Sequence, residues 1–366
     1  MTQPEHPPDS PDEDPKANLR SGDELARAGR YKEAMEAYEK ALQQMLDAGS
    51  YARVPDAVEK VVEVLQKSST IVGAIRRVEN VIKKFRQLDL PEETGRLYAT
   101  LGRIHAKLSD FGSAAECFEN AAQFFDAAGP DACALAGSYM VKAGELWERE
   151  GATDRGERLV MRGLTRFCGE STGIQEVERE ALEALRAGDH EAAAVAFCKL
   201  GDHFENAKQA AHDDGELVKY RRLWTAVQAR LTHLRSVALL VAFLCEKKLG
   251  REEEAAGLAE QLVADLRAAV RAAKDSLHDL EDVRRTTHDL FTLVLVQELR
   301  GKRVEDPSRL LDDGLSPSQL KALSSSPFYQ LALTAAKVGV SEVKNDLAGN
   351  YLGYLERVKP AFLDLI

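Results

Sequence analysis

Proline and aromatic residues are scarce in most of this sequence. Phe, Trp and Tyr together make up 6% of the 366 residues. Five of the twelve prolines lie within the first fifteen residues, and none occurs between residues 131 and 306. Because an interior proline breaks a helix, the proline-free span suits a run of long helices. Apolar residues recur every three or four positions, as in Val58, Val61 and Leu65, and strand-like alternation is almost absent. The sequence predicts an all-α fold.

Cysteines and long apolar runs are also few. The five cysteines form no C-x-x-C pair, and their odd number argues against a disulfide framework: Cys117, Cys133, Cys168, Cys198 and Cys245. We therefore expect reduced, mostly buried thiols and a cytoplasmic protein. The longest apolar run, residues 237–245, is about half as long as a bilayer span requires, so we expect no transmembrane segment. Any association with a membrane would then be peripheral, through partner proteins.

The first fifteen residues contain five acidic residues and no Lys or Arg. A secretory signal needs a basic start and an apolar centre, so this stretch is not one. Its proline and acidic content cannot bury enough apolar surface to offset the loss of chain entropy. We expect residues 1–15 to be a disordered acidic tail.

Signatures of catalysis and of ligand binding are missing from the sequence. It contains no G-x-x-x-x-G-K-[ST] phosphate loop, no H-E-x-x-H, no G-x-S-x-G and no Cys/His set at zinc spacing. The nearest approach is the pair of dipeptides His278-Asp279 and His288-Asp289, whose ten-residue separation does not place them on one helix face. We interpret them as ordinary surface or packing residues. We therefore expect a protein that is not an enzyme and that holds no cofactor or metal.

Basic residues are outnumbered, with 49 Lys and Arg against 60 Asp and Glu, which gives a net charge of -11. This balance argues against nucleic acid as a general partner. A local exception is the segment 53–86, which holds eight basic and four acidic residues.

A pattern of small and aromatic residues recurs five times up to about residue 205. The small residues that open the second helix of each copy are 40, 40, 42 and 37 residues apart: Ala34, Ala74, Ala114, Gly156 and Ala193. Each copy predicts a helix hairpin, and one hairpin cannot bury its own apolar face, so neighbouring hairpins must stack.

Each hairpin is expected to close on small residues. Those of the first helices should let the second helices approach: Gly22, Gly102, Gly144 and Ala181. Aromatic residues of the second helices should fill the groove: Tyr38, Phe118 and Phe197. Glycines lie at turns that need an unusual backbone angle: Gly29, Gly151 and Gly188.

These small and aromatic positions resemble the signature of the tetratricopeptide repeat, over about residues 18–205 and best in 22–41 and 98–121. The period near 40, in place of the usual 34, implies longer helices. Together with the run from Ala114 to Phe125 it resembles the soluble NSF attachment proteins, the SNAP family. That resemblance implies an adaptor in membrane trafficking that links a SNARE-type helical bundle to an AAA ATPase. The acidic tail and the apolar ending, residues 360–366, depart from the family.

The domain organisation that follows has three parts. After the tail, residues 16–212 should form a right-handed solenoid of stacked antiparallel helix hairpins, and residues 213–366 a C-terminal helical bundle that caps it. The bundle should contain a long helix ended by Gly250, one or two further long helices up to residue 300, and a helix start at Asp306-Pro307. Ser316 and Gln319 have the spacing of a capping box.

One position in every copy is basic. Two residues before each hairpin turn lie the five residues that we call the basic column: Arg27, Lys67, Lys107, Arg149 and Arg186. The last turn of a helix favours Lys or Arg, because a cation complements the helix dipole and the carbonyl ends. The alternative is a partner-binding stripe, since the first helices of such solenoids line the concave surface. The two interpretations are compatible.

Three functions remain open on the sequence. The first is a non-catalytic scaffold or adaptor whose concave surface binds another protein through an acidic helix or extended segment. The second is the narrower SNAP-like adaptor. The third is a regulatory sensor that responds to a peptide or ligand, because the 62-residue step from Ala193 to Ala255 leaves room for a pocket.

Overall fold

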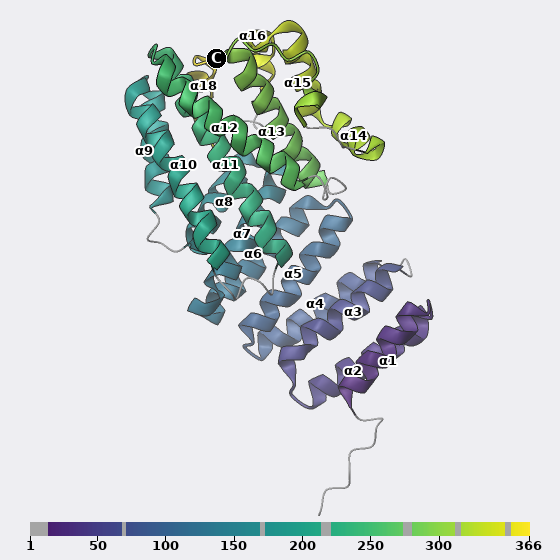
Figure 1. Ribbon diagram of the computed structural model, residues 1–366. Coiled ribbons are helices and arrows are strands. Elements are labelled where there is room, and N and C mark those ends of the chain that lie inside the picture. The colour runs from purple at the N-terminus through teal and green to yellow at the C-terminus, as the bar shows by residue number, and fades with distance from the viewer. Residues whose placement is uncertain are drawn as a thin grey trace, which may run out of the picture. The chain divides into compact units, whose positions relative to one another are not determined.

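The computed structural model describes residues 14–67, 71–168, 173–213, 221–273, 280–311, 316–347 and 353–366. Every regular element in these ranges is helical, so the all-α prediction is confirmed (Figure 1). The chain divides into two compact units, residues 1–150 and 151–366, here called unit 1 and unit 2. The change from repeats to bundle at residues 213–215 stays a prediction, because residues 214–220 lie outside the described ranges.

Unit 1 is a series of seven α-helices, each packed against the next in sequence. They are α1 (Pro15–Arg27), α2 (Tyr31–Asp47), α3 (Val54–Lys67), α4 (Ile71–Gln87), α5 (Pro91–Lys107), α6 (Phe111–Ala128) and α7 (Cys133–Arg149). Beyond these sequential contacts, α3 packs against α5, the first helix of the following hairpin. Stacked helix hairpins therefore build the unit, as the repeat predicts.

Close approach of paired helices depends on glycine facing an aromatic ring. A Cβ atom built on Gly22 of α1 would overlap the ring of Tyr38 on α2. A Cβ on Gly102 of α5 would lie 3.0 Å from Cε1 of Phe118 on α6. Both rings are buried, and the expectation that they fill the groove is confirmed.

The hairpin turns need a left-handed backbone conformation. Gly29 has φ 73°, Gly151 has φ 89° and Gly188 has φ 73°, as the sequence predicts. In the third hairpin a non-glycine residue, Ser109, holds the same position with φ 60°. The turn geometry is thus kept where its preferred residue is missing.

Helix α1 begins inside the stretch that the sequence assigns to the tail. Pro15 is its first residue, and the side chain of Asp14 caps it by accepting a hydrogen bond from the Lys16 amide at 2.9 Å. Proline suits this position because the first helical amide has no intrahelical partner. Residues 1–13 lie outside the described ranges.

Unit 2 begins with α8 (Thr153–Cys168), α9 (Ile174–Arg186) and α10 (His190–Asp213), followed by the long helices α11 (Arg221–Lys248), α12 (Glu252–Ala273) and α13 (Leu280–Leu299). Short elements complete it: η7 (Pro307–Leu311), α14 (Pro317–Ser324), α15 (Pro327–Val338), α16 (Val340–Val343), η9 (Gly353–Val358) and α18 (Lys359–Leu363). Helix α11 packs between α10 and α12, and α13 packs against α12 and α15.

The local predictions for this region are mostly accurate. Gly250 follows α11 with φ 72°, and Ser316 and Gln319 form both hydrogen bonds of a capping box. The stretch before residue 300 holds two helices, α12 and α13. A helical element does begin at Asp306-Pro307, with Pro307 as its first residue, but within the described residues it is a 3₁₀ helix and not an α-helix.

One segment of α11, Val227–Lys248, is long and apolar enough to cross a membrane by length and composition alone. Of the 18-residue stretch of this segment that is apolar enough, 78% is buried inside the protein. Helix α11 is enclosed by its neighbours in unit 2, and a core helix passes the same test.

An arginine attaches the C-terminal segment to unit 2. Arg357 of η9 forms ion pairs with Glu178 of α9 and, at 3.9 Å, with Glu157 of α8. Both carboxylates are buried, and buried carboxylates require a partner. Burial raises the pKa of Glu178, and the charge and hydrogen bond of Arg357 oppose that rise.

We expect Gly22→Ala to lower the stability of unit 1 by about 1–3 kcal/mol, because the added methyl group displaces the buried Tyr38 ring. The matched control is Gly257→Ala in α12, where a Cβ meets no atom within 4 Å. That change should stabilise its helix by up to about 1 kcal/mol. Urea unfolding of both variants measures the difference, and equal effects would contradict this account of helix pairing.

We expect Arg357→Met to destabilise unit 2 by about 2–3 kcal/mol at neutral pH. This is less than the loss when a fully buried ion pair is broken, because the Arg357 side chain is 37% exposed. Without Arg357 the pKa of Glu178 rises further, so the folded state holds a proton that the unfolded state releases. The deficit should therefore shrink as the pH falls toward about 4.5. The control is Arg309→Met, which breaks a surface ion pair in which the arginine side chain is 79% exposed. This variant should show neither the loss of stability nor its dependence on pH.

Candidate functional site

The basic column occupies one structural position throughout. Its members are the final residues of five helices, α1, α3, α5, α7 and α9: Arg27, Lys67, Lys107, Arg149 and Arg186. Each cation therefore lies beside the carbonyl end of a first helix, where it complements the helix dipole. The structure supports the helix-end interpretation directly, and binding by the column remains a proposal.

Two members of the basic column pack on aromatic rings of the preceding hairpin. Nζ of Lys67 lies 5.8 Å from the ring centroid of Tyr31, and Cζ of Arg149 lies 3.9 Å from that of Phe111. Tyr31 and Phe111 are the first residues of α2 and α6, the second helices of their hairpins. A cation over an aromatic ring thus connects consecutive hairpins at the same place twice. The sequence contains both rings, but the pairing appears only when the hairpins stack.

Other members contact neutral polar groups. Nζ of Lys107 donates to Oε1 of Gln66 at 2.7 Å, and Nη2 of Arg186 donates to the backbone oxygen of Arg357 at 3.5 Å. Arg27 is exposed at the end of α1. Within the part of the chain that the structure describes, Arg27, Lys67 and Lys107 form no ion pair with a carboxylate.

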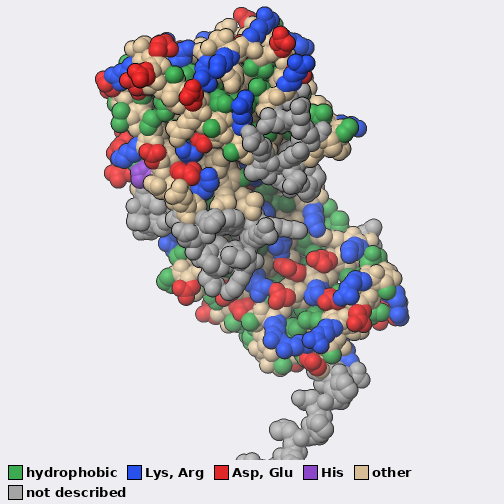
Figure 2. All heavy atoms as spheres, viewed as in Figure 1, with side chains coloured by type: hydrophobic (Ala, Val, Ile, Leu, Met, Phe, Trp, Pro, Cys, Tyr) green, Lys and Arg blue, Asp and Glu red, His purple; other side chains and the backbone are tan. Residues whose placement is uncertain are grey.

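Three basic residues farther up the first helices α3 and α5 behave differently, because each pairs with an acidic residue of the neighbouring first helix. The pairs are Lys60 with Asp23, Arg96 with Asp56 and Arg103 with Glu59. Burial opposes ionisation of Asp23, but hydrogen bonds from Lys60 and Tyr38 outweigh it and lower its pKa. In Figure 2 Lys/Arg and Asp/Glu side chains are interspersed over the visible face of unit 1. Lys60, Arg96 and Arg103 are thus paired with carboxylates, whereas Arg27, Lys67 and Lys107 form no ion pair within the described residues.

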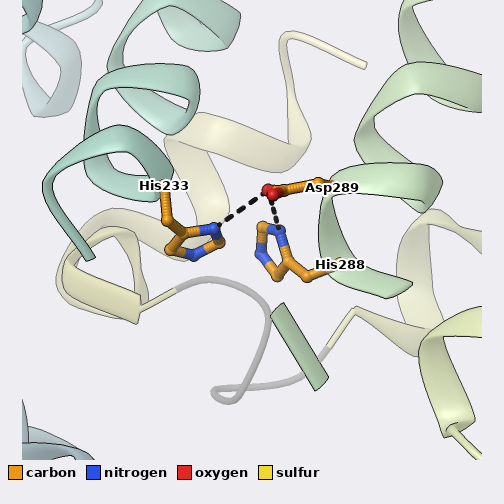
Figure 3. Close-up of side chains that lie close together, drawn as sticks. All are labelled: His233, His288 and Asp289. Carbon is orange, nitrogen blue, oxygen red and sulfur yellow. Dashed lines mark hydrogen bonds and ion pairs between the residues drawn. The ribbon is translucent and has the colours of Figure 1, made fainter. Parts of the chain in front are cut away.

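A second cluster lies in the core of unit 2. His233 of α11 meets His288 and Asp289 of α13, and Figure 3 shows both imidazoles directed at the Asp289 carboxylate. Nδ1 of His233 is 3.2 Å and Nδ1 of His288 is 4.0 Å from Oδ1 of Asp289. The two rings meet edge to face with centroids 4.1 Å apart. The exposed fractions are 9%, 2% and 6%, so the cluster is shielded from water.

Charges around this cluster shift its titration. Burial, assisted by the nearby charges of Arg230, Arg284 and Arg285, lowers the pKa of His233 well below its ordinary value. Burial raises the pKa of Asp289 to about 6, although His288 and Arg285 oppose the rise. His233 is therefore a neutral imidazole at pH 7.

The sequence interpretation of the histidines was incomplete. Burial and packing of His288 and Asp289 agree with the expectation of packing residues, but His233 was missed altogether. It lies 55 residues upstream on another helix, so no spacing rule connects it with them. His278 and Asp279 lie outside the described residues.

The cysteines have the properties of packing residues. Cys117 and Cys245 are buried, and burial raises the pKa of each thiol to about 12, which keeps it protonated. Trp147 is buried as well, and its indole donates a hydrogen bond to Glu119 of α6. The side chains of Cys168 and Trp224 lie outside the described residues.

Comparison with known proteins identifies the first hairpin. Residues 15–44, which hold α1 and most of α2, match the family model of the tetratricopeptide repeat. The first hairpin is therefore tetratricopeptide-like. A search of curated proteins gives no match. A search of solved structures finds a protein described as a circular tandem repeat protein with novel repeat topology and enhanced subunit contact surfaces. The alignment covers 96% of this chain and 88% of the other protein's chain, at 15% sequence identity and a TM-score of 0.30. A score that low supports no argument about this chain.

We expect the contact between Arg149 and Phe111 to couple their hairpins measurably. In a double-mutant cycle of Arg149→Ala and Phe111→Leu, which removes the aromatic face but keeps an apolar side chain, the coupling energy should be about 0.5–1 kcal/mol. A second cycle of Arg27→Ala with Phe111→Leu is the control and should give none. Additive effects in the first cycle would show that the cation and the ring do not interact.

Proposed function

We propose that this protein is a non-catalytic interaction scaffold, and that the first-helix ends of unit 1 bind an acidic segment of a partner protein. Tetratricopeptide-like repeats generally serve protein–protein interaction. The observation that carries the proposal is the contrast within the first helices. Lys60, Arg96 and Arg103 along α3 and α5 pair with carboxylates of the neighbouring first helix. The residues at the helix ends, Arg27, Lys67 and Lys107, form no ion pair within the described residues.

Cations that recur at regular intervals and form no ion pair within the described residues favour a partner whose carboxylates can pair with them. An exposed helix end keeps its stabilising role when it binds such a group, so both interpretations of the basic column hold together. An acidic helix or an extended acidic segment fits this requirement. The cytoplasm is the proposed location, with membranes reached only through partner proteins.

A narrower form of the proposal is an adaptor of the SNAP kind. Its support is the pair of features that suggested the resemblance, hairpins repeating at about 40 residues and the three long helices α11, α12 and α13 of 28, 22 and 20 residues. The partners would then be a SNARE-type helical bundle and an AAA ATPase. Failure of the purified protein to retain a SNARE bundle, and to stimulate the ATPase on it, would remove the narrower form and leave the scaffold standing.

Charge reversal tests the binding surface. We expect the triple variant Arg27→Glu, Lys67→Glu and Lys107→Glu to bind acidic peptides, selected on the wild-type protein from a displayed library, at least tenfold more weakly. Arg149 is kept because its guanidinium lies 3.9 Å from the Phe111 ring centroid, a closer contact than the 5.8 Å from Lys67 to Tyr31. Binding by the wild type should weaken as salt rises, since exposed charges are screened over about 10 Å at 0.1 M. Fluorescence anisotropy measures the affinities.

In the matched control the charges of three exposed basic residues of α4 are reversed: Arg76, Lys83 and Lys84. This variant changes the net charge by the same amount as the basic-column variant. It should keep the wild-type affinity. Melting curves of both variants should fall only slightly, because each helix-end charge is worth about 0.3–1 kcal/mol. Unchanged affinity in the folded column variant would refute the proposal. Loss in the α4 variant alone would move the binding surface to the basic segment 53–86.

A further inference from the structure

We propose that His233, His288 and Asp289 of unit 2 form a binding site for one divalent transition-metal ion, with zinc as the best match. The proposal is independent of the scaffold function. It rests on three potential ligand atoms, supplied by two helices, that converge in the protein interior.

The donor set has the chemistry that zinc selects. Two imidazole nitrogens and one carboxylate oxygen are borderline ligands that bind zinc in many proteins, whereas calcium and magnesium prefer sites made of oxygen alone. An imidazole coordinates a metal in its neutral form. With two neutral imidazoles and one carboxylate as ligands, a bound zinc ion would form a complex with a net charge of about +1.

The geometry is close to a coordination sphere. In a tetrahedral site with bonds of about 2.0–2.2 Å, neighbouring ligand atoms stand about 3.3–3.6 Å apart. The two nitrogen-to-oxygen separations to Oδ1 of Asp289 are 3.2 and 4.0 Å, and all three ligand atoms lie within 4.8 Å of one another. Shifts of about 1 Å at the ligand atoms would bring the three donors to these separations, and the fourth position of the tetrahedron would be left for a water molecule.

Packing holds the three side chains in place. His288 meets Phe328 of α15 edge to face at 5.5 Å, and next to it Thr287 shares a 2.7 Å hydrogen bond with Ser326. A metal ion here would join α11 to α13 across the core and stabilise unit 2, because it binds the folded state only.

The charge of the surroundings limits the affinity. Arg230, Arg284 and Arg285 act on His233 and oppose an added cation. We therefore expect weaker binding than in structural sites with four protein ligands, in the micromolar range. The competing explanation is a polar cluster without a metal, in which Nδ1 of His233 donates a hydrogen bond to Asp289 and His288 packs beside them.

Metal titration of the full chain, purified without a histidine tag and stripped with a chelator, separates the two. We expect one zinc per chain by elemental analysis after dialysis against 50 μM zinc chloride. Cobalt(II) should bind the same site with the strong visible absorption of a four- or five-coordinate complex, and excess zinc should remove that absorption. Zinc should also raise the melting temperature of unit 2.

Two variants, His233→Asn and His288→Asn, each remove one histidine ligand, because an amide is a poor zinc ligand. In His233→Asn the side-chain amide can still donate a hydrogen bond to Asp289 from near the place of Nδ1. Each should bind zinc at least tenfold more weakly and lose the cobalt absorption. His203→Asn, on α10, is the control and should retain both. Asp289→Asn serves if a histidine variant fails to fold.

The proposal is overturned if the wild-type chain takes up no zinc and shows no cobalt absorption at 1 mM metal. It is also overturned if the Asn variants bind both metals as the wild type does. In either case the three residues are a polar cluster without a metal, and the scaffold function is unaffected.

Discussion

The distance between the two helices of a hairpin is the constraint on which the rest of unit 1 depends. Glycine at positions 22 and 102 lets the rings of Tyr38 and Phe118 lie against the backbone of the first helix. Close approach aligns each hairpin with its neighbour, so that Lys67 meets Tyr31 and Arg149 meets Phe111. An extra methyl group at the glycine would separate the helices and misplace every contact that follows from their spacing.

In unit 1 the partner of a charged side chain depends on which part of the neighbouring hairpin it faces. Where two first helices lie side by side, opposite charges face each other, as in Arg96 with Asp56 and Arg103 with Glu59. At two of the helix ends the cation faces a neutral group, a ring for Lys67 and a side-chain amide for Lys107. Exposed pairs of this kind add little stability.

Unit 2 has a more polar interior. Buried carboxylates are neutralised by Arg357 from the C-terminal segment, and two histidines share the carboxylate of Asp289 in the core. Such groups are costly to bury and add little net stability compared with apolar residues, but each is satisfied only when distant segments meet correctly. The ion pair of Arg357 therefore determines where the chain end attaches, and the His–Asp cluster fixes α11 against α13.

The sequence alone determined the features that depend on neighbours along the chain. Helix periodicity indicated the all-α class, glycine spacing indicated the turns at Gly29 and Gly188, and the repeat located the basic column two residues before each turn. These follow from backbone geometry within one hairpin. Tertiary structure alone decided which side chains meet across hairpins. Nothing in the spacing of His233 joins it to Asp289, and nothing near Arg357 indicates Glu178, because those contacts depend on the packing of whole helices.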